Sequence, residues 1–185
     1  AKTITFESTA SVLEALLKES FLIKKYQPYY NTKEKDNKSY SFVTVTNEEY
    51  PAISLIRGRE LEKQLENNPK KYIETFGPFV SGSQLKEAMA IVRKIFPYRD
   101  PSCTPLQGKP CFNASIGLCP GVCTGAISAK EYKKQLKTFY TFMNGDVKKV
   151  QKEIEKKMFS SSKKQRFEEA ASYKKKLYAL GHIQD

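Results

Sequence analysis

The stretch that decides the fold is CTPLQGKPCFNASIGLCPGVC, residues 103–123. It holds every cysteine of the chain at the spacing C-x7-C-x7-C-x3-C; they are Cys103, Cys111, Cys119 and Cys123. Cysteines scattered at random would rarely gather in this way. Thiolates that share one positive centre hold such an irregular segment together. The sequence therefore predicts one metal or iron–sulfur site that orders a Pro- and Gly-rich segment.

Other states of the four cysteines stay open. Two disulfides need an oxidising compartment, to which nothing in the sequence points, and unligated thiols are a further alternative. By number, four thiolates suit zinc and a [4Fe–4S] cluster equally well. Structural zinc sites usually show two short knuckles, whereas here only Cys119 and Cys123 form such a pair. The spacing therefore favours the cluster slightly over zinc.

The bulk composition indicates a negatively charged partner. The chain has 32 basic and 20 acidic residues, a net charge of +12, and 11 Tyr and 11 Phe. Such a surface attracts polyanions, of which nucleic acid is the commonest. The sequence has a single His and no glycine-rich phosphate-binding loop, which argues against a hydrolase triad and a nucleotide cofactor. No apolar run of about 18 residues occurs, so we expect a cytoplasmic protein without a membrane segment.

Upstream of the cysteines, apolar alternation predicts two strands. They cover residues 41–46 and 52–57, with a polar turn between them. Residues 58–71 are polar and fit a helix or a loop. The sequence Phe-Gly-Pro-Phe at residues 76–79 predicts a turn with aromatic flanks.

Helical spacing of apolar residues predicts one helix on each side of the cysteines. The first begins at Ser81 or Ser83 and is closed by Pro97. The second begins after Ser128, a plausible N-cap, and runs to about Met143.

The last segment, residues 146–181, predicts two antiparallel helices with a hinge at residues 160–162, which are all Ser. Such a hairpin meets along one seam and has a thin core. Ala170 and Ala171 are small enough for the aromatic side chain of a partner to pack closely. We therefore predict a separate partner, with docking on the protein itself as the alternative.

The first segment predicts a strand over residues 3–6 and then a helix that ends before Pro28. Because the chain starts inside this strand without Met, we expect a piece of a longer protein. Glu19 reads as a solvated carboxylate on an amphipathic helix. The alternative is that Glu19 binds Mg²⁺ near a phosphate of a nucleic acid. Lys24 and Lys25 would then contact the nucleic-acid backbone.

Several blocks resemble the UvrC family, the nuclease subunits of bacterial excision repair. ESFLIKKYQPYYN, residues 19–31, resembles the end of its GIY-YIG nuclease domain. DNKSY (36–40), FGPF (76–79) and KIFPYR (94–99) are similar to the blocks that follow there. The cysteine segment is similar to the four-cysteine region of the family, and RFEEAASY (166–173) resembles its UVR motif.

The resemblance implies a [4Fe–4S] cluster on the four cysteines and UvrB as the partner of the hairpin. It also implies that Glu19 binds Mg²⁺ or Mn²⁺ and that Asn31 is the catalytic asparagine, with the remaining catalytic residues outside this chain. The DNA contacts that we expect are Lys24, Lys25, Lys38, Arg99 and Lys109. The partner contacts that we expect are Phe167 as the main anchor, Ala170, Ala171, Tyr173 and Leu177.

The predicted fold class is α+β, in four regions. They are the end of a GIY-YIG-type domain (1–35), a small α/β region (36–99), the cysteine region with its helix (100–143) and a helical hairpin (144–185). The implied function is incision of damaged double-stranded DNA in nucleotide excision repair by the complete subunit, while this chain alone cuts nothing. The alternative is a non-catalytic, zinc-binding adaptor that recruits a partner through its hairpin.

Overall fold

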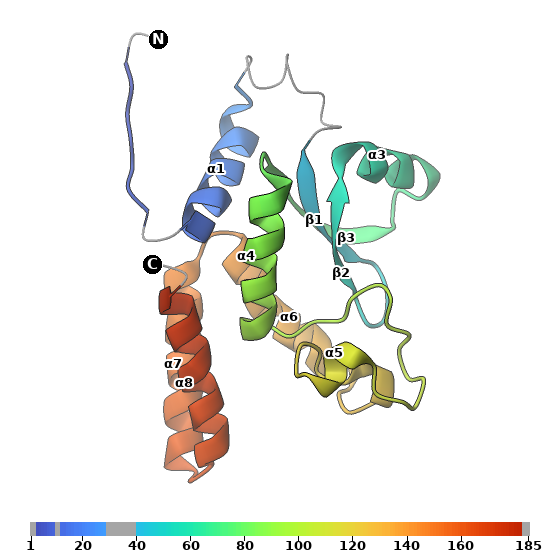
Figure 1. The fold of residues 1–185 in the computed structure, drawn as a ribbon, viewed down its shortest axis with the longest axis vertical. Coiled ribbons are helices and arrows are strands. Elements are labelled where there is room, and N and C mark those ends of the chain that lie inside the picture. The colour runs from blue at the N-terminus through green and yellow to red at the C-terminus, as the bar shows by residue number, and fades with distance from the viewer. Residues whose placement is uncertain (1–2, 10–11, 29–39, 183–185) are drawn as a thin grey trace.

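Helices and a small sheet share one hydrophobic core, which reaches from Leu13 to Leu180 (Figure 1). The structure is a computed structural model that describes residues 3–9, 12–28 and 40–182. Its mixture of helices and antiparallel strands confirms the predicted α+β class. Among the described residues, no helix is both long and apolar enough to cross a lipid bilayer.

A three-stranded antiparallel sheet lies in the upper half of Figure 1. Strand β1 (Ser41–Thr46) runs between β2 (Ile53–Arg57) and β3 (Tyr72–Phe79). Both flanks of β1 are paired, and Val43 at its centre is fully buried. The two predicted strands are confirmed. For the polar segment 58–71 the sequence left a helix and a loop as alternatives, and the structure has a helix there, α3 (Gly58–Asn67).

β3 was missed by the sequence analysis, and the turn predicted at residues 76–79 is wrong. These residues are the last part of the strand, and a register shift against β1 accommodates the Gly77–Pro78 pair. Gly77 has a φ of +138°, and a Cβ on it would lie 2.7 Å from Phe42 Cδ1. The glycine therefore serves close approach between strands.

Two predicted helix starts are confirmed by their caps. α4 (Gly82–Ile95) begins after Ser81, whose hydroxyl accepts a hydrogen bond from the first turn. α6 (Ala129–Met143) begins after Ser128 with a capping box that Glu131 completes. Each cap satisfies backbone N–H groups that have no partner inside the helix.

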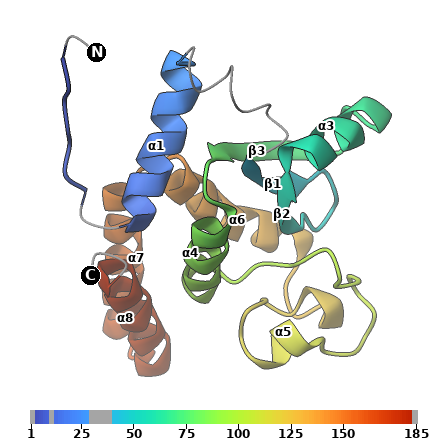
Figure 2. The ribbon, with the colours of Figure 1, turned by 45° about the horizontal axis from the view of Figure 1, so that its top comes forward.

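An aromatic cluster joins the sheet to α4 and α6. Phe139 of α6 is fully buried and lies edge-on to Phe76 of β3, with ring centroids 6.0 Å apart. Phe96, directly after α4, meets Phe139 and Phe142 at 6.3 and 5.3 Å. Such pairs add about 0.5–1.5 kcal/mol each beyond burial. The cluster thereby fixes both ends of the cysteine loop, which leaves α4 and returns to α6 in Figure 2.

α1 (Val12–Tyr26) confirms the predicted N-terminal helix and packs on β3; its buried residues include Leu13 and Leu17. The strand predicted before it is wrong. Residues 3–9 have no regular secondary structure, and Ile4 and Phe6 are 88% and 96% exposed. Their alternation finds no neighbouring strand among the described residues, and unpaired alternation does not make a strand.

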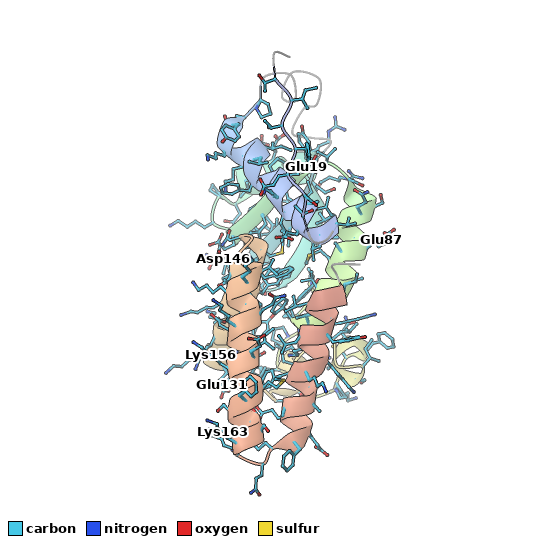
Figure 3. The ribbon with its side chains drawn as sticks, turned by 90° about the vertical axis from the view of Figure 1, so that its left-hand side faces the viewer. Glu19, Glu87, Glu131, Asp146, Lys156 and Lys163 are labelled. Atoms are coloured by element: carbon cyan, nitrogen blue, oxygen red, sulfur yellow. The ribbon has the colours of Figure 1, made fainter. Side chains whose placement is uncertain are left out.

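The chain ends in a helical hairpin of α7 (Val147–Lys163) and α8 (Phe167–His182), which lie side by side in Figures 1 and 3. We call residues 40–143 the body. The buried apolar residues of the hairpin are Val150, Ile154 and Leu180. The hinge predicted at residues 160–162 is wrong, because these serines complete the last turn of α7. The chain reverses through Gln165, which has a φ of +58°.

Candidate metal centre and helical hairpin

The segment between α4 and α6, the cysteine loop (residues 96–128), is held together by backbone hydrogen bonds. The N–H of Leu106 donates to the carbonyl of Val122 at 3.1 Å, and the N–H of Gly108 to that of Cys123 at 3.0 Å. These bonds close the loop on itself and bring its first and last cysteines together.

Three of the four predicted ligands meet in this loop. The Sγ atoms of Cys103, Cys111 and Cys123 all lie within 4.8 Å of one another, so these cysteines could hold a metal. Cys103 and Cys123 are buried and Cys111 is half-buried. Cys119 lies outside this group and packs in the hydrophobic core, 5% exposed. The structure thus gathers three thiols and leaves the fourth apart.

The environment of these thiols shifts their pKa values in opposite directions. Burial, with a hydrogen bond to Cys111, raises the pKa of Cys103 to about 12. Burial also acts to raise the pKa of Cys111, but hydrogen bonds from the Ala114 backbone and from Cys123 and Cys103 lower it on balance. In addition, the backbone N–H of Cys111 donates to Cys123 Sγ at 3.3 Å. Thiols this close ionise together only beside a positive centre, so the donor set fits a metal group.

Arg99 ties the cysteine loop to the connection between β1 and β2. Its side chain is 7% exposed; Nε donates to the carbonyl of Cys103 at 2.9 Å, and Nη1 donates to that of Tyr50 at 2.6 Å and to Glu48. Its backbone N–H donates to the hydroxyl of Tyr132 at 2.8 Å. A guanidinium satisfied in this way does not reach a DNA phosphate, so the predicted DNA contact at Arg99 is corrected to an internal one.

Arg93 of α4 makes a second tie that the sequence analysis missed. Its guanidinium donates to the carbonyls of Leu118 and Tyr98, both at 3.1 Å, and to Asp100 at 3.4 Å. Burial acts to raise the pKa of Asp100, but hydrogen bonds from Ser102 and the charge of Arg93 lower it on balance. The signal that could have predicted this tie is the position of Arg93, a basic residue a few positions before the cysteine loop.

Three of the four other predicted DNA contacts lie among the described residues, and all three are on the surface. Lys24 and Lys25 are exposed in the last turn of α1, and Lys109 is exposed in the cysteine loop. Lys38 lies outside the described residues. Exposed ammonium groups can reach a phosphate, so these contacts stay predictions.

Glu19 lies exposed on α1, as Figure 3 shows. It borders a hollow of about 840 Å³ between α1 and residues 5–9. Asn31 lies outside the described residues. Among the residues that the structure describes, Glu19 belongs to no metal-competent group, so its role as a Mg²⁺ ligand stays a prediction.

The five predicted partner contacts separate into two sets. Phe167 is 66% exposed, Ala171 is exposed and Ala170 is half-buried. Tyr173 and Leu177 instead pack against the protein's own core. The first three are available to a partner, and the last two hold α8 on the body.

The sequence analysis missed a second exposed aromatic residue, Phe159 of α7, which is 60% exposed. It borders a surface hollow of about 430 Å³ together with Lys156, Ser160, Lys163 and Lys164. Figure 3 shows Lys156 and Lys163 on the same helix. Phe159 follows Met158 and so falls off the apolar stripe of α7; this offset was the signal that could have found it.

Together, the fold and the site define a class of protein: an α+β body with a metal-competent cysteine loop, followed by a helical hairpin with exposed aromatic side chains. The family model for the UvrC/Cho excinuclease middle domain matches residues 40–142, and the model for the UvrB/uvrC motif, UVR, matches residues 148–181. The chain therefore belongs to the UvrC family, as the resemblance predicted.

Curated relatives carry the name UvrABC system protein C. The protein of Clostridium kluyveri is 37% identical over 180 residues, which is 95% of this chain and 28% of that protein. That of Synechococcus sp. (strain JA-2-3B'a(2-13)) is 34% identical over 181 residues, 97% of this chain and 28% of that protein. That of Methanosarcina acetivorans is 33% identical over 185 residues, 100% of this chain and 34% of that protein. The chain thus spans about a third or less of the relatives it matches. No solved structure matches it significantly.

Proposed function

We propose that this chain is the middle part of a DNA excision nuclease subunit that incises DNA around lesions in nucleotide excision repair. The observation that carries the proposal is the order of its parts: a middle-domain match, then a UVR match, on a body with three close cysteines. Its net charge of +12 suits a protein that works on DNA. We further propose that it acts in the cytoplasm.

The chain supplies the cysteine loop and the helical hairpin of the subunit and does not cut DNA by itself. Glu19 and Asn31 are only part of a catalytic set, and the Mg²⁺ or Mn²⁺ that they bind belongs to the complete nuclease domain. We expect no nicking when clean protein is incubated with supercoiled, ultraviolet-damaged plasmid and Mg²⁺. Mg²⁺-dependent nicking by the chain alone would falsify this division of labour.

The group on the cysteine loop is a [4Fe–4S] cluster. Cys103, Cys111 and Cys123 would hold it, since their thiols already lie within 4.8 Å of one another, and Cys119 is the fourth thiolate within the loop. When bound, its iron supplies the positive centre that the thiolates need. Protein purified without oxygen should contain iron and sulfide. Zinc in their place would support the adaptor alternative.

The partners are UvrB, through the hairpin, and damaged double-stranded DNA. Phe167, Ala170 and Ala171 supply the surface for UvrB. Lys24, Lys25, Lys38 and Lys109 supply charge for DNA phosphates. Because phosphate contacts release counterions, the affinity for a duplex should fall at least about tenfold between about 50 and 200 mM salt. An affinity that does not change with salt would remove DNA from the partners of this chain.

A further inference from the structure

A pocket of about 280 Å³ lies where the hairpin meets the body. Its walls come from the end of α4, from the cysteine loop near Gly117, and from α6, α7 and α8. The polar side chains that line it are Gln135, Thr138, Lys157, Tyr173 and Lys176. The sequence analysis assigned it no role, because its walls come from segments far apart in the chain.

Two ammonium groups, those of Lys157 and Lys176, line this pocket. Among the described residues, neither Lys157 of α7 nor Lys176 of α8 takes part in an ion pair. Two acids lie beside the pocket and bond to hydroxyl groups that line it: Glu153 accepts a hydrogen bond from Thr138 at 3.3 Å, and Glu169 is hydrogen-bonded to Tyr173. Neither acid forms an ion pair with Lys157 or Lys176 among the described residues, so no direct contact neutralises the two ammonium groups.

Lys176 is half-buried and Lys157 is exposed. A second like charge beside a half-buried ammonium group adds to the cost of keeping it charged. Burial lowers the pKa of Lys176, and the charge of Lys157 lowers it further. The ammonium of Lys176 also lies 5.8 Å from the ring centroid of Tyr173, a contact that repays only part of this cost. Gln135 also lines the pocket, and its side-chain amide forms no hydrogen bond among the described residues. Several N–H donors that line one pocket are typical of an anion site.

We propose that this pocket binds a phosphate group between Lys157 and Lys176. Lysine is a point-charge ligand for phosphate, and two lysines from different helices would hold its oxygens from two sides. A Cβ on Gly117 would meet no atom within 4 Å, so the rim is open for entry. The phosphate comes from a DNA backbone or from free phosphate in solution. The pocket itself does not depend on the proposed function; only the DNA source rests on it.

Titration calorimetry of the whole chain with inorganic phosphate tests the site. We expect a Kd on the order of 1 mM, weakened at least about tenfold by the double variant Lys157→Gln/Lys176→Gln. The matched control is Lys156→Gln/Lys175→Gln, which removes the same charge from exposed positions of the same two helices. Its Kd should stay within about twofold of the wild type, and thermal unfolding should show that both variants fold.

Equal weakening in both double variants, or no phosphate binding by the wild-type chain, overturns the proposal. A short undamaged duplex then identifies the source of the phosphate. Displacement of bound phosphate by the duplex assigns the pocket to the DNA backbone, and lack of displacement assigns it to free phosphate. A complete subunit that fails to incise DNA while its pocket still binds phosphate would contradict the proposed function and leave the pocket standing.

Discussion

The body buries most of its aromatic side chains, whereas the hairpin exposes most of its own. In the body, Phe139 and Tyr132 are fully buried; Phe139 contacts several rings, and Tyr132 lies beside Tyr50. In the hairpin, Phe159, Phe167 and Tyr178 are 60%, 66% and 69% exposed. Burial of apolar area is the main driving force of folding, so the body uses its rings for its own stability. Of the hairpin rings, Tyr173 packs against the core, and the three exposed rings are available as anchors that a partner could bury in an interface.

The largest expected effect comes from removing a ring from the body. Phe139→Ala should lower the free energy of unfolding by about 4 kcal/mol, because it deletes a buried ring and leaves a cavity. Chemical denaturation followed by circular dichroism measures it. The matched variant in the hairpin, Phe167→Ala, should change stability by no more than about 0.5 kcal/mol. Equal losses in the two variants would erase the contrast between body and hairpin.

Arg99→Met tests the polar interior of the body. It should cost about 3 kcal/mol, because the carbonyls of Tyr50 and Cys103 lose a buried donor and Glu48 loses its partner. Its metal content should fall as well, since the backbone of Cys103 is no longer held. Arg59→Met, in an exposed position of α3, is the control. Unchanged stability and metal content would show that Arg99 does not position the loop.

Phe167→Ala should weaken binding to the UvrB hairpin by about 1–2 kcal/mol, the scale of an interface anchor, while the chain stays folded. Fluorescence titration with the isolated partner hairpin measures the affinity. Phe159→Ala asks whether the interface extends to the hollow on α7. An unchanged affinity in the Phe167 variant would show that Phe167 is not an anchor of the interface.

The smallest effect concerns the cap of α6. Ser128→Ala should cost about 1 kcal/mol at neutral pH. Hydrogen bonds from the side chain and the backbone of Ser128 lower the pKa of Glu131 in the folded state. The stability gained through this carboxylate is thus present above its unfolded pKa and is lost as the pH falls through the lowered one. The difference between wild type and variant should shrink in acid, and a constant difference would exclude a contribution from the carboxylate.

Local signals in the sequence predicted the elements whose causes are local. Ser128, read as an N-cap, located α6 at its first residue, and apolar alternation located β1. β3 was missed because Gly77–Pro78 is a turn signal when read alone, and only the approach of Phe42 shows what the glycine is for. The hinge was misplaced because serines favour turns and yet are tolerated at the end of a helix.

The sequence predicted which residue types form the candidate sites, but it did not predict which of these residues lie in contact with one another. Cysteine spacing indicated a metal group, but it does not tell which thiols meet, and the structure brings together three of the four. Net charge indicated a polyanion, but it does not separate an exposed lysine from Arg99, which is buried beside Glu48. Lys157 and Lys176 stand on different helices, so only the packed hairpin puts them in one pocket.

The hydroxyl of Tyr132 has a consequence for how the chain is assembled during synthesis. It donates to the carbonyl of Pro51 at 2.9 Å, across 81 residues of sequence, and accepts from the backbone of Arg99. A ribosome makes the chain from its N-terminus, so all the cysteines leave it before Tyr132 does. Contacts between residues far apart in sequence form late. The tie of Tyr132 to Pro51 and Arg99 can therefore form only after all four cysteines have left the ribosome and α6 has emerged and docked.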